Sequence, residues 1–227
     1  MDRRRFHKLC GGLLAGAASL HARADNHAPQ PKAALTFDDG SAVTLESLAP
    51  GESWIFSYPY RTTPCFLVRL NESAPNHGTW SGGVDADQSV VAFSAICSHK
   101  MSHPAKPISH ISYRDEPVNF FDSSGTRQTK SGVISCCSER SVYDPAAAGT
   151  VLSGPAPVPL AAISLTTDGN GALYATGSPG PDQYERFLTA FGFRLALEYG
   201  VTDVRARVGE KTVAVKASEF SAQQVLC

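Results

Sequence analysis

The sequence lacks several features that would point to common functions. No stretch of its 227 residues reaches the roughly 18–20 consecutive apolar residues of a transmembrane helix. Its formal net charge is −1, and basic residues do not cluster beyond position 8, whereas nucleic-acid-binding domains carry a basic patch or stripe. There is no Ser–His–Asp arrangement, phosphate-binding loop or closely paired zinc spacing. We therefore expect no nucleic-acid partner, no catalysis by this chain alone, and no transmembrane anchor once the leader is removed.

The first 24 residues have the features of an export signal. Arginines occupy positions 3–5, an apolar run spans 9–20, and Ala22-Arg23-Ala24 is an A-x-A cleavage site. Glycines at 11, 12 and 16 make a buried helix a poor alternative. Positions 3–8 also resemble the twin-arginine signal, apart from a histidine at position 7. That route exports folded proteins, commonly ones with a metal cofactor, so we expect a periplasmic protein.

Five cysteines remain after such a cleavage. An odd number in an oxidising compartment leaves at least one thiol unpaired or bound to something else. A set of structural disulfides cannot use all five, whereas metal ligation can. The five are Cys65, Cys97, Cys136, Cys137 and Cys227.

Most of the chain reads as short β-strands. Apolar or β-branched runs alternate with turn clusters at 71–83, 122–125 and 168–171. This pattern predicts a mainly β, antiparallel sandwich or small barrel. The predicted strands cover 54–58, 65–70, 89–94, 118–122, 132–136, 161–166 and 172–176.

The C-terminal part has a different pattern. Apolar residues at three- and four-residue spacing predict a helix over 182–199, after a Pro-Gly-Pro breaker. The segments 204–208 and 212–216 read as a terminal hairpin. We therefore divide the mature chain into a β domain, 25–178, and a helix-plus-hairpin extension, 179–227.

Two short segments carry residues suited to metal binding. Cys97-Ser98-His99 follows one predicted strand, and the segment 136–144 follows another. A Cys-x-His pair places a soft thiolate beside an imidazole, and two such loops facing each other can hold a pair of irons. Alone, Cys-x-His is a weak signal in a chain with six Cys and seven His.

A proline-rich segment, 149–160, lies just downstream. Pro155, Pro157 and Pro159 fix the backbone and remove donors, which makes a stiff loop that can shield a site from water. A rigid linker between two strands is the simpler interpretation of the prolines by themselves.

Taken together, these segments resemble the Rieske iron–sulfur family, and are similar to the small-subunit family of periplasmic arsenite oxidases. The resemblance covers roughly residues 55–165. The matching residues are Cys97, Ser98 and His99 in a first box, Cys136, Ser141, Tyr143 and Asp144 in a second box, and Gly154, Pro155, Ala156 and Pro157 in a cover loop.

The resemblance implies a Rieske-like β fold and a 2Fe–2S cluster. The loops 97–103 and 136–144 would bind the cluster, and the loop 149–160 would cover it. Ser141 and Tyr143 would donate hydrogen bonds to its sulfurs and tune its potential. The implied function is periplasmic electron transfer, as a small subunit or partner of an oxidoreductase such as a molybdenum-containing catalytic subunit or a c-type cytochrome.

Three positions depart from the family. Ser102 and Ser138 stand where the family has a disulfide between the two loops, and Glu139 stands where it has its second histidine ligand. Three interpretations stay open: Glu139 completes a set with Cys97, His99 and Cys136; Cys137 does so instead; or the cluster is lost and the chain is a structural or assembly subunit.

Two further expectations follow. An anionic ligand in place of a neutral imidazole favours the oxidised cluster, so we expect a potential below that of ordinary high-potential Rieske proteins. The remaining thiols, Cys65 and Cys227, are candidates for a disulfide that would fix the C-terminus.

Overall fold

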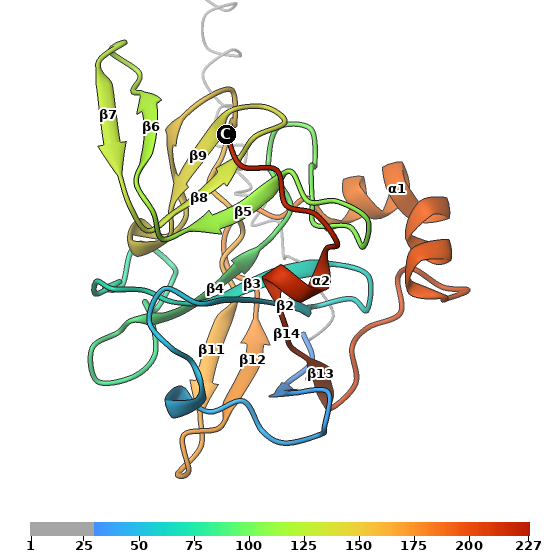
Figure 1. Ribbon diagram of the computed structural model, residues 1–227. Coiled ribbons are helices and arrows are strands. Elements are labelled where there is room, and N and C mark those ends of the chain that lie inside the picture. The colour runs from blue at the N-terminus through green and yellow to red at the C-terminus, as the bar shows by residue number, and fades with distance from the viewer. Residues whose placement is uncertain (1–29) are drawn as a thin grey trace, which may run out of the picture.

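The computed structural model describes residues 30–227, so the predicted signal peptide lies outside the described residues. This part of the chain is mainly β, with helices near its C-terminus (Figure 1). The strands are β1 Ala33–Thr36, β2 Ser53–Ser57, β3 Pro64–Arg69, β4 Val90–Ser94, β5 Ile111–Arg114, β6 Val118–Phe121, β7 Arg127–Lys130, β8 Val133–Cys136, β9 Ser141–Asp144, β10 Thr150–Ser153, β11 Ser164–Thr167, β12 Leu173–Gly177, β13 Lys211–Val213 and β14 Val215–Lys216. The helices are α1 Tyr184–Tyr199 and α2 Ala217–Phe220, with 3₁₀ turns η1 Leu45–Ser47 and η2 Pro145–Ala147.

The central sheet, in the order β14-β2-β3-β4, is antiparallel and buried on both faces. Successive side chains of a strand point to opposite faces. On β3, Phe66 and Val68 therefore enter one core, while Cys65 and Leu67 enter another. This two-sided burial explains why β3 and β4 read as nearly continuous apolar runs.

Two outer sheets cover these faces (Figure 1). The sheet β10-β9-β8-β5 closes the first core, where Ile111 and Ile134 join Phe93 of the central sheet. The sheet β11-β12-β1-β13 closes the second core, where Leu173 meets Leu67. A separate hairpin, β6-β7, stands beside the first of these sheets. The central sheet thus holds the two outer sheets in place.

The predicted mainly β, antiparallel character is confirmed, and so is the long helix. The prediction of a terminal hairpin is wrong. β13 pairs in parallel with β1, and β14 pairs antiparallel with β2, while 204–208 contains no strand. The chain thereby satisfies the free edges of two different sheets, with Thr212 and Ala214 buried. A local hairpin would have left both edges unpaired.

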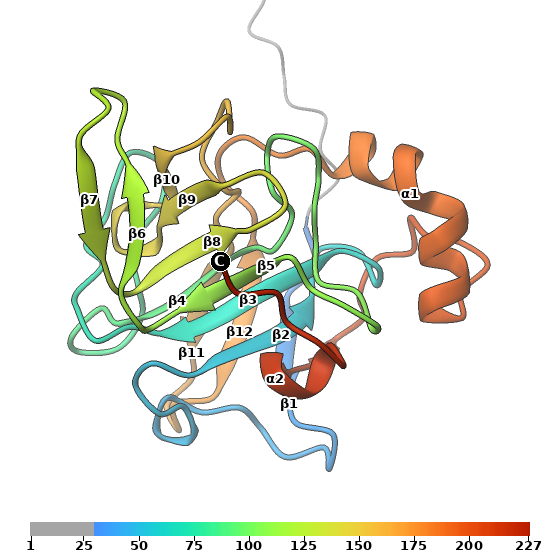
Figure 2. The same cartoon turned by 45° about the horizontal axis from the view of Figure 1, so that its top comes forward.

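Helix α1 lies to one side of the sheets (Figure 2). Its apolar stripe, which includes Tyr184, Phe187 and Leu195, packs against Ile96 and Ala161. The helix ends where Gly200 adopts a left-handed conformation (φ 62°) and donates its N–H to the carbonyl of Ala196. No helix within residues 30–227 is both long and apolar enough to cross a bilayer.

Two phenylalanines test this account of the core. Phe93 is fully buried and its ring lies 5.3 Å from that of Trp80, whereas Phe193 is 83% exposed on α1. Phe93→Ala should lower the free energy of unfolding by about 3–5 kcal/mol, because it leaves a cavity between two sheets. Phe193→Ala should change it by less than about 0.5 kcal/mol. Urea denaturation of both variants measures the difference, and equal effects would contradict this description of the core.

Candidate metal centre

Two buried thiols meet at the centre of the site. Cys97 follows β4 and Cys136 is the last residue of β8; both are fully buried and neither is in a disulfide. Their thiols interact directly, since each is the largest cause of the other's shift in pKa. This contact lowers the pKa of Cys97 to about 6 and raises the pKa of Cys136, because the two sulfurs then share one proton. Such a pair suits one soft metal ion.

Hydrogen-bond donors surround the Cys97 sulfur. The Tyr143 hydroxyl lies 3.1 Å from Sγ and accepts the backbone N–H of Ser98, also at 3.1 Å. Burial raises the pKa of Tyr143, so the phenol keeps its proton and can donate it to the sulfur. The backbone N–H of His99 and the buried Ser141 hydroxyl also help to lower the pKa of Cys97. The Ser141 hydroxyl has no other hydrogen-bond partner. The positions predicted to tune a cluster, Ser141 and Tyr143, thus face a sulfur.

A second pair lies across the same two loops. His99 Nδ1 is 3.3 Å from Glu139 Oε2, and that buried nitrogen makes no hydrogen bond. Metal bonds of about 2.0–2.1 Å in tetrahedral geometry place two ligand atoms roughly 3.3–3.4 Å apart. The spacing of Nδ1 and Oε2 therefore matches two ligands of one ion. Neither side chain is fully buried, since His99 is 29% and Glu139 19% exposed.

The arrangement consists of two pairs, each with one residue from each loop. Among residues 30–227, no three His, Cys, Asp or Glu side chains converge on a single ion. Two ligands per ion is what a binuclear iron–sulfur cluster requires, because bridging sulfides complete each iron's coordination. The donors present thus fit a 2Fe–2S cluster with thiolates on one iron and imidazole and carboxylate on the other.

Lys100 lies next to the second pair. Its Nζ is 3.5 Å from Glu139 Oε1, although its side chain is largely exposed. Nothing in the sequence pattern indicates this contact, and only the folded loops bring Lys100 to Glu139. An adjacent cation offsets part of the negative charge that a carboxylate ligand brings.

The first loop is closed by its own backbone. The Met101 N–H donates to the Cys97 carbonyl at 2.9 Å, and the Cys97 N–H donates to the Ser102 carbonyl at 2.8 Å. The side chain of Gln183, just before α1, donates to the Cys97 carbonyl at 3.1 Å. The Ser102 side chain also acts on the Cys136 thiol, where it opposes part of the rise in pKa. Nothing in the spacing of Gln183 indicated this role.

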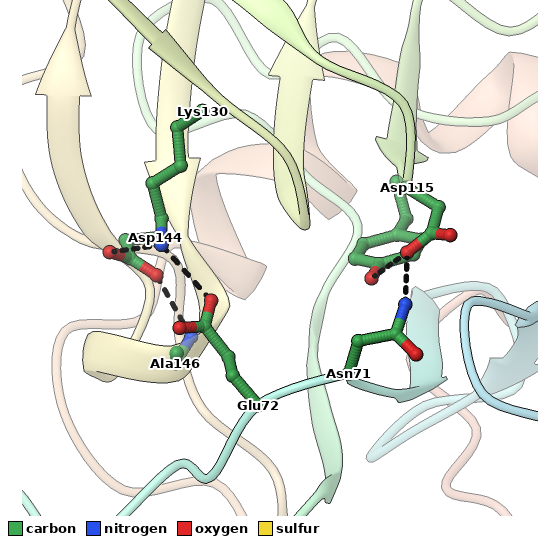
Figure 3. Close-up of polar contacts among 7 residues, drawn as sticks. Asn71, Glu72, Asp115, Lys130, Asp144 and Ala146 are labelled. Carbon is green, nitrogen blue, oxygen red and sulfur yellow. Dashed lines mark hydrogen bonds and ion pairs between the residues drawn. The ribbon is translucent and has the colours of Figure 1, made fainter.

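The second loop is the tip of the β8–β9 hairpin. Cys136 pairs with Ser141 across this hairpin, and Cys137 through Arg140 form the turn. At its far end, the Asp144 carboxylate accepts the N–H of Ala146 at 3.0 Å and so caps η2. Figure 3 shows Lys130 between Asp144 and Glu72, at 3.6 and 3.0 Å from their carboxylates. These contacts connect the end of the second box to the segment that follows β3 of the central sheet.

A cavity of about 560 Å³ adjoins this ion-pair network. Its lining includes Glu72, Asp115 and Lys130, and Asn71 donates to Asp115 at 2.8 Å (Figure 3). None of the residues of the two cysteine loops lines it. Its polar groups are engaged with one another, so the paired ligands remain the better candidate site.

The predicted cover loop contacts both cysteine loops. Part of it is strand, since β10 occupies 150–153, and Gly154 begins the turn that follows. Gly154 adopts φ 87° against the backbone of Arg140 and Ser141 at the hairpin tip. Farther along, the Val158 carbonyl accepts the Ser98 hydroxyl at 2.6 Å. Pro155, Ala156 and Pro157 lie between these two contacts.

The predicted disulfide between Cys65 and Cys227 is wrong. Cys65 is fully buried on β3, where its thiol donates to the Tyr58 carbonyl at 3.1 Å and burial raises its pKa. Cys227 instead bonds to Cys137, with their Cα atoms 5.6 Å apart. Strand alternation sends Cys65 into the second core, away from the C-terminus.

This disulfide also removes the alternative fourth ligand. The sulfur of Cys137 is bonded to Cys227, so it offers no thiolate to a metal. Glu139 is left as the side chain that faces His99.

No protein-family model matches this chain. Among solved structures it is similar to the soluble domain of the Rieske protein II (soxF) from Sulfolobus acidocaldarius, with 25% identity, 69% of this chain and 82% of that chain covered, and a TM-score of 0.45. It is also similar to the ferredoxin of carbazole 1,9a-dioxygenase from Nocardioides aromaticivorans, at 20% identity over 61% of this chain and 95% of that chain, with a TM-score of 0.34. The quaternary ammonium Rieske monooxygenase CntA matches at 13% identity over 69% of this chain and 36% of its own, with a TM-score of 0.35. All three TM-scores lie below 0.5.

Gly154 provides a test of the cover loop. A Cβ there would lie 2.6 Å from the Ser141 Cα, whereas Gly180, with nearly the same φ (89°), has no atom within 4 Å. Gly180→Ala should lower the free energy of unfolding by about 1–2 kcal/mol through backbone strain alone. Gly154→Ala should cost at least about 2 kcal/mol more, because the hairpin tip must shift. Urea denaturation compares the two, and an equal loss would show that Gly154 does not need its close approach.

Proposed function

We propose that this chain is a Rieske-type electron-transfer protein. Cys97 and Cys136 would bind one iron of a 2Fe–2S cluster, and His99 and Glu139 the other. The observation that carries the proposal is the pairing across the loops, with two thiols in contact and an imidazole nitrogen 3.3 Å from a carboxylate oxygen. The resemblance of the same boxes to the Rieske family supports it.

The surrounding residues suit a one-electron centre. When bound, such a cluster accepts and releases one electron. The Tyr143 and Ser141 hydroxyls stabilise negative charge on the sulfur of Cys97, which favours the reduced state. Glu139 acts in the opposite sense, and Lys100 offsets part of its charge. Water does not reach one side of the site, because Cys97 and Cys136 are fully buried there.

The other side of the site is the proposed docking face. His99 and Glu139 are partly exposed, and the adjoining cover loop has Gly154 and Pro155 on the surface. One-electron transfer requires close approach of a partner, and this face offers the shortest path. We propose that the partner is the catalytic or cytochrome component of a periplasmic oxidoreductase, as in arsenite oxidase-like complexes, and that the export signal places the chain there.

Metal analysis tests the proposal directly. The protein isolated after export should be brown and contain about two irons and two labile sulfides. Cys97→Ser should abolish both, because a hydroxyl cannot replace the buried thiolate. Cys65→Ser is the matched control: Cys65 is equally buried and free, but its thiol bonds only backbone carbonyls, so this variant should keep iron and sulfide.

A colourless, folded wild-type protein would contradict the proposal. That outcome would favour a Rieske-like structural subunit that has lost its cluster. Equal iron loss in Cys97→Ser and Cys65→Ser would instead place the metal elsewhere.

Charges at the second pair should set the midpoint potential. Lys100→Gln removes a cation beside Glu139 and should lower the potential by roughly 20–50 mV, since the exposed charge is partly screened. Glu139→His replaces an anionic ligand by a neutral one and should raise it by on the order of 100 mV. Redox titration followed by visible absorption measures both.

Remote substitutions with the same charge change are the controls. Lys211 is the first residue of β13 and Glu210 directly precedes it; both are exposed, and the sheet that contains β13 carries no cysteine loop. Lys211→Gln and Glu210→His should shift the potential by less than about 10 mV. Shifts in the same direction for Lys100→Gln and Glu139→His would contradict the assignment of Glu139 as a ligand.

A further inference from the structure

The C-terminal tail, residues 217–227, runs along the segment that follows the first cysteine loop. The Ala222 N–H donates to the Lys106 carbonyl, and the backbone of Ser109 both donates to Gln223 and accepts from Val225, each at 2.8 Å. Ser109 and Gln224 form a parallel bridge. Residues 222–225 of the tail are thus held by backbone hydrogen bonds to residues 106–109, the segment that follows the first loop.

Side chains lock the start of this tail. The buried Ser221 hydroxyl donates to the Ala105 carbonyl at 2.7 Å. The Lys106 ammonium lies 4.3 Å from the centre of the Phe220 ring, and the Lys106 N–H donates to Glu198 of α1 at 2.7 Å. The tail therefore has a defined position on the 105–109 segment before its last residues are reached.

The end of the tail is bonded to the second loop. Cys227 forms its disulfide with Cys137, which directly follows the proposed ligand Cys136 and lies two residues before Glu139. The Cys137 N–H donates to the His110 carbonyl at 2.7 Å. In both ribbon views the C-terminus lies beside β8, whose end begins this loop (Figures 1 and 2).

These contacts connect the two loops through a third segment. Within residues 30–227 the loops share no disulfide of their own, and the Cys137–Cys227 bond is the covalent link that reaches either of them. We propose that Cys227 is a positioning residue: through Cys137, the tail holds the hairpin tip that carries Cys136 and Glu139 in register with the first loop. This inference rests on the proposed function, because it concerns how the ligand pairs are aligned.

The bond is chemically reversible. It forms when the thiols of Cys137 and Cys227 give two electrons and two protons to an external disulfide, which is reduced to two thiols. Excess thiol or phosphine reverses the reaction. Cys227 is exposed and Cys137 half-buried, so a small reductant can reach the bond while Cys97 and Cys136 stay buried.

Hydrogen exchange on the full chain tests the proposal. Cys227→Ser removes an exposed terminal sulfur, so the variant is expected to fold. Amide exchange of residues 137–141 should accelerate by at least about tenfold, while exchange in β3 and β4 stays unchanged, because only the tip is released. In cluster-loaded protein, iron release to a ferrous chelator should accelerate by a similar factor.

Three comparisons separate positioning from general stability. Leu226→Ser alters the neighbouring exposed residue and should change neither rate. Phosphine reduction of the wild type should reproduce Cys227→Ser and have no effect on that variant. The double variant Cys137→Ser/Cys227→Ser should match either single variant, since both remove the same bond.

Each outcome decides the proposal. Unchanged exchange at 137–141 in Cys227→Ser would overturn it, and so would acceleration spread evenly over all strands or a wild-type Cys227 that titrates as a free thiol. Exchange is measured on metal-free protein as well. Suppose that the wild type binds no iron but Cys227→Ser still accelerates exchange at residues 137–141. The proposed electron-transfer role would then fail, while the inference that the tail holds the hairpin tip would stand.

Discussion

The contact between the thiols of Cys97 and Cys136 is the constraint on which the site depends. One sulfur follows a strand of the central sheet and the other ends a strand of an outer sheet, so the contact exists only while the two sheets keep their packing. The apolar core between them, with Phe93, Ile111 and Ile134, therefore serves the chemistry as well as the stability. It brings two polarizable groups together out of water, where hydrogen bonds and charges act strongly.

Charge around the pairs follows a consistent pattern. The buried side supplies neutral donors to sulfur, and the neutral phenol of Tyr143 is the best defined of them. The outer side carries Glu139 with Lys100 beside it, so this carboxylate, the proposed ligand, is accompanied by a cation. A carboxylate at this position is then compatible with a one-electron centre, because its charge is partly offset at short range.

The segment after residue 178 is part of the same assembly. β13 and β14 complete the edges of two sheets, Gln183 binds the first loop, and the tail reaches the second loop through its disulfide. Gln183 and the tail, which are far from the two loops in sequence, thus contact them in the fold. The β domain and the extension share cores, edges and loop contacts, and the site draws on both.

Much of the fold and of the candidate site could be predicted from local patterns in the sequence. Apolar and β-branched runs between turn clusters specified β2, β3, β4 and β8, the three- and four-residue spacing specified α1, and the boxes at 97–99 and 136–144 contain the proposed donors. The partners of Cys137 and Cys227, the edges taken by β13 and β14, and the approach of Lys100 to Glu139 were decided only by tertiary structure. Each of these depends on where separate sheets and loops come to lie, and neither residue spacing nor strand alternation carries that information.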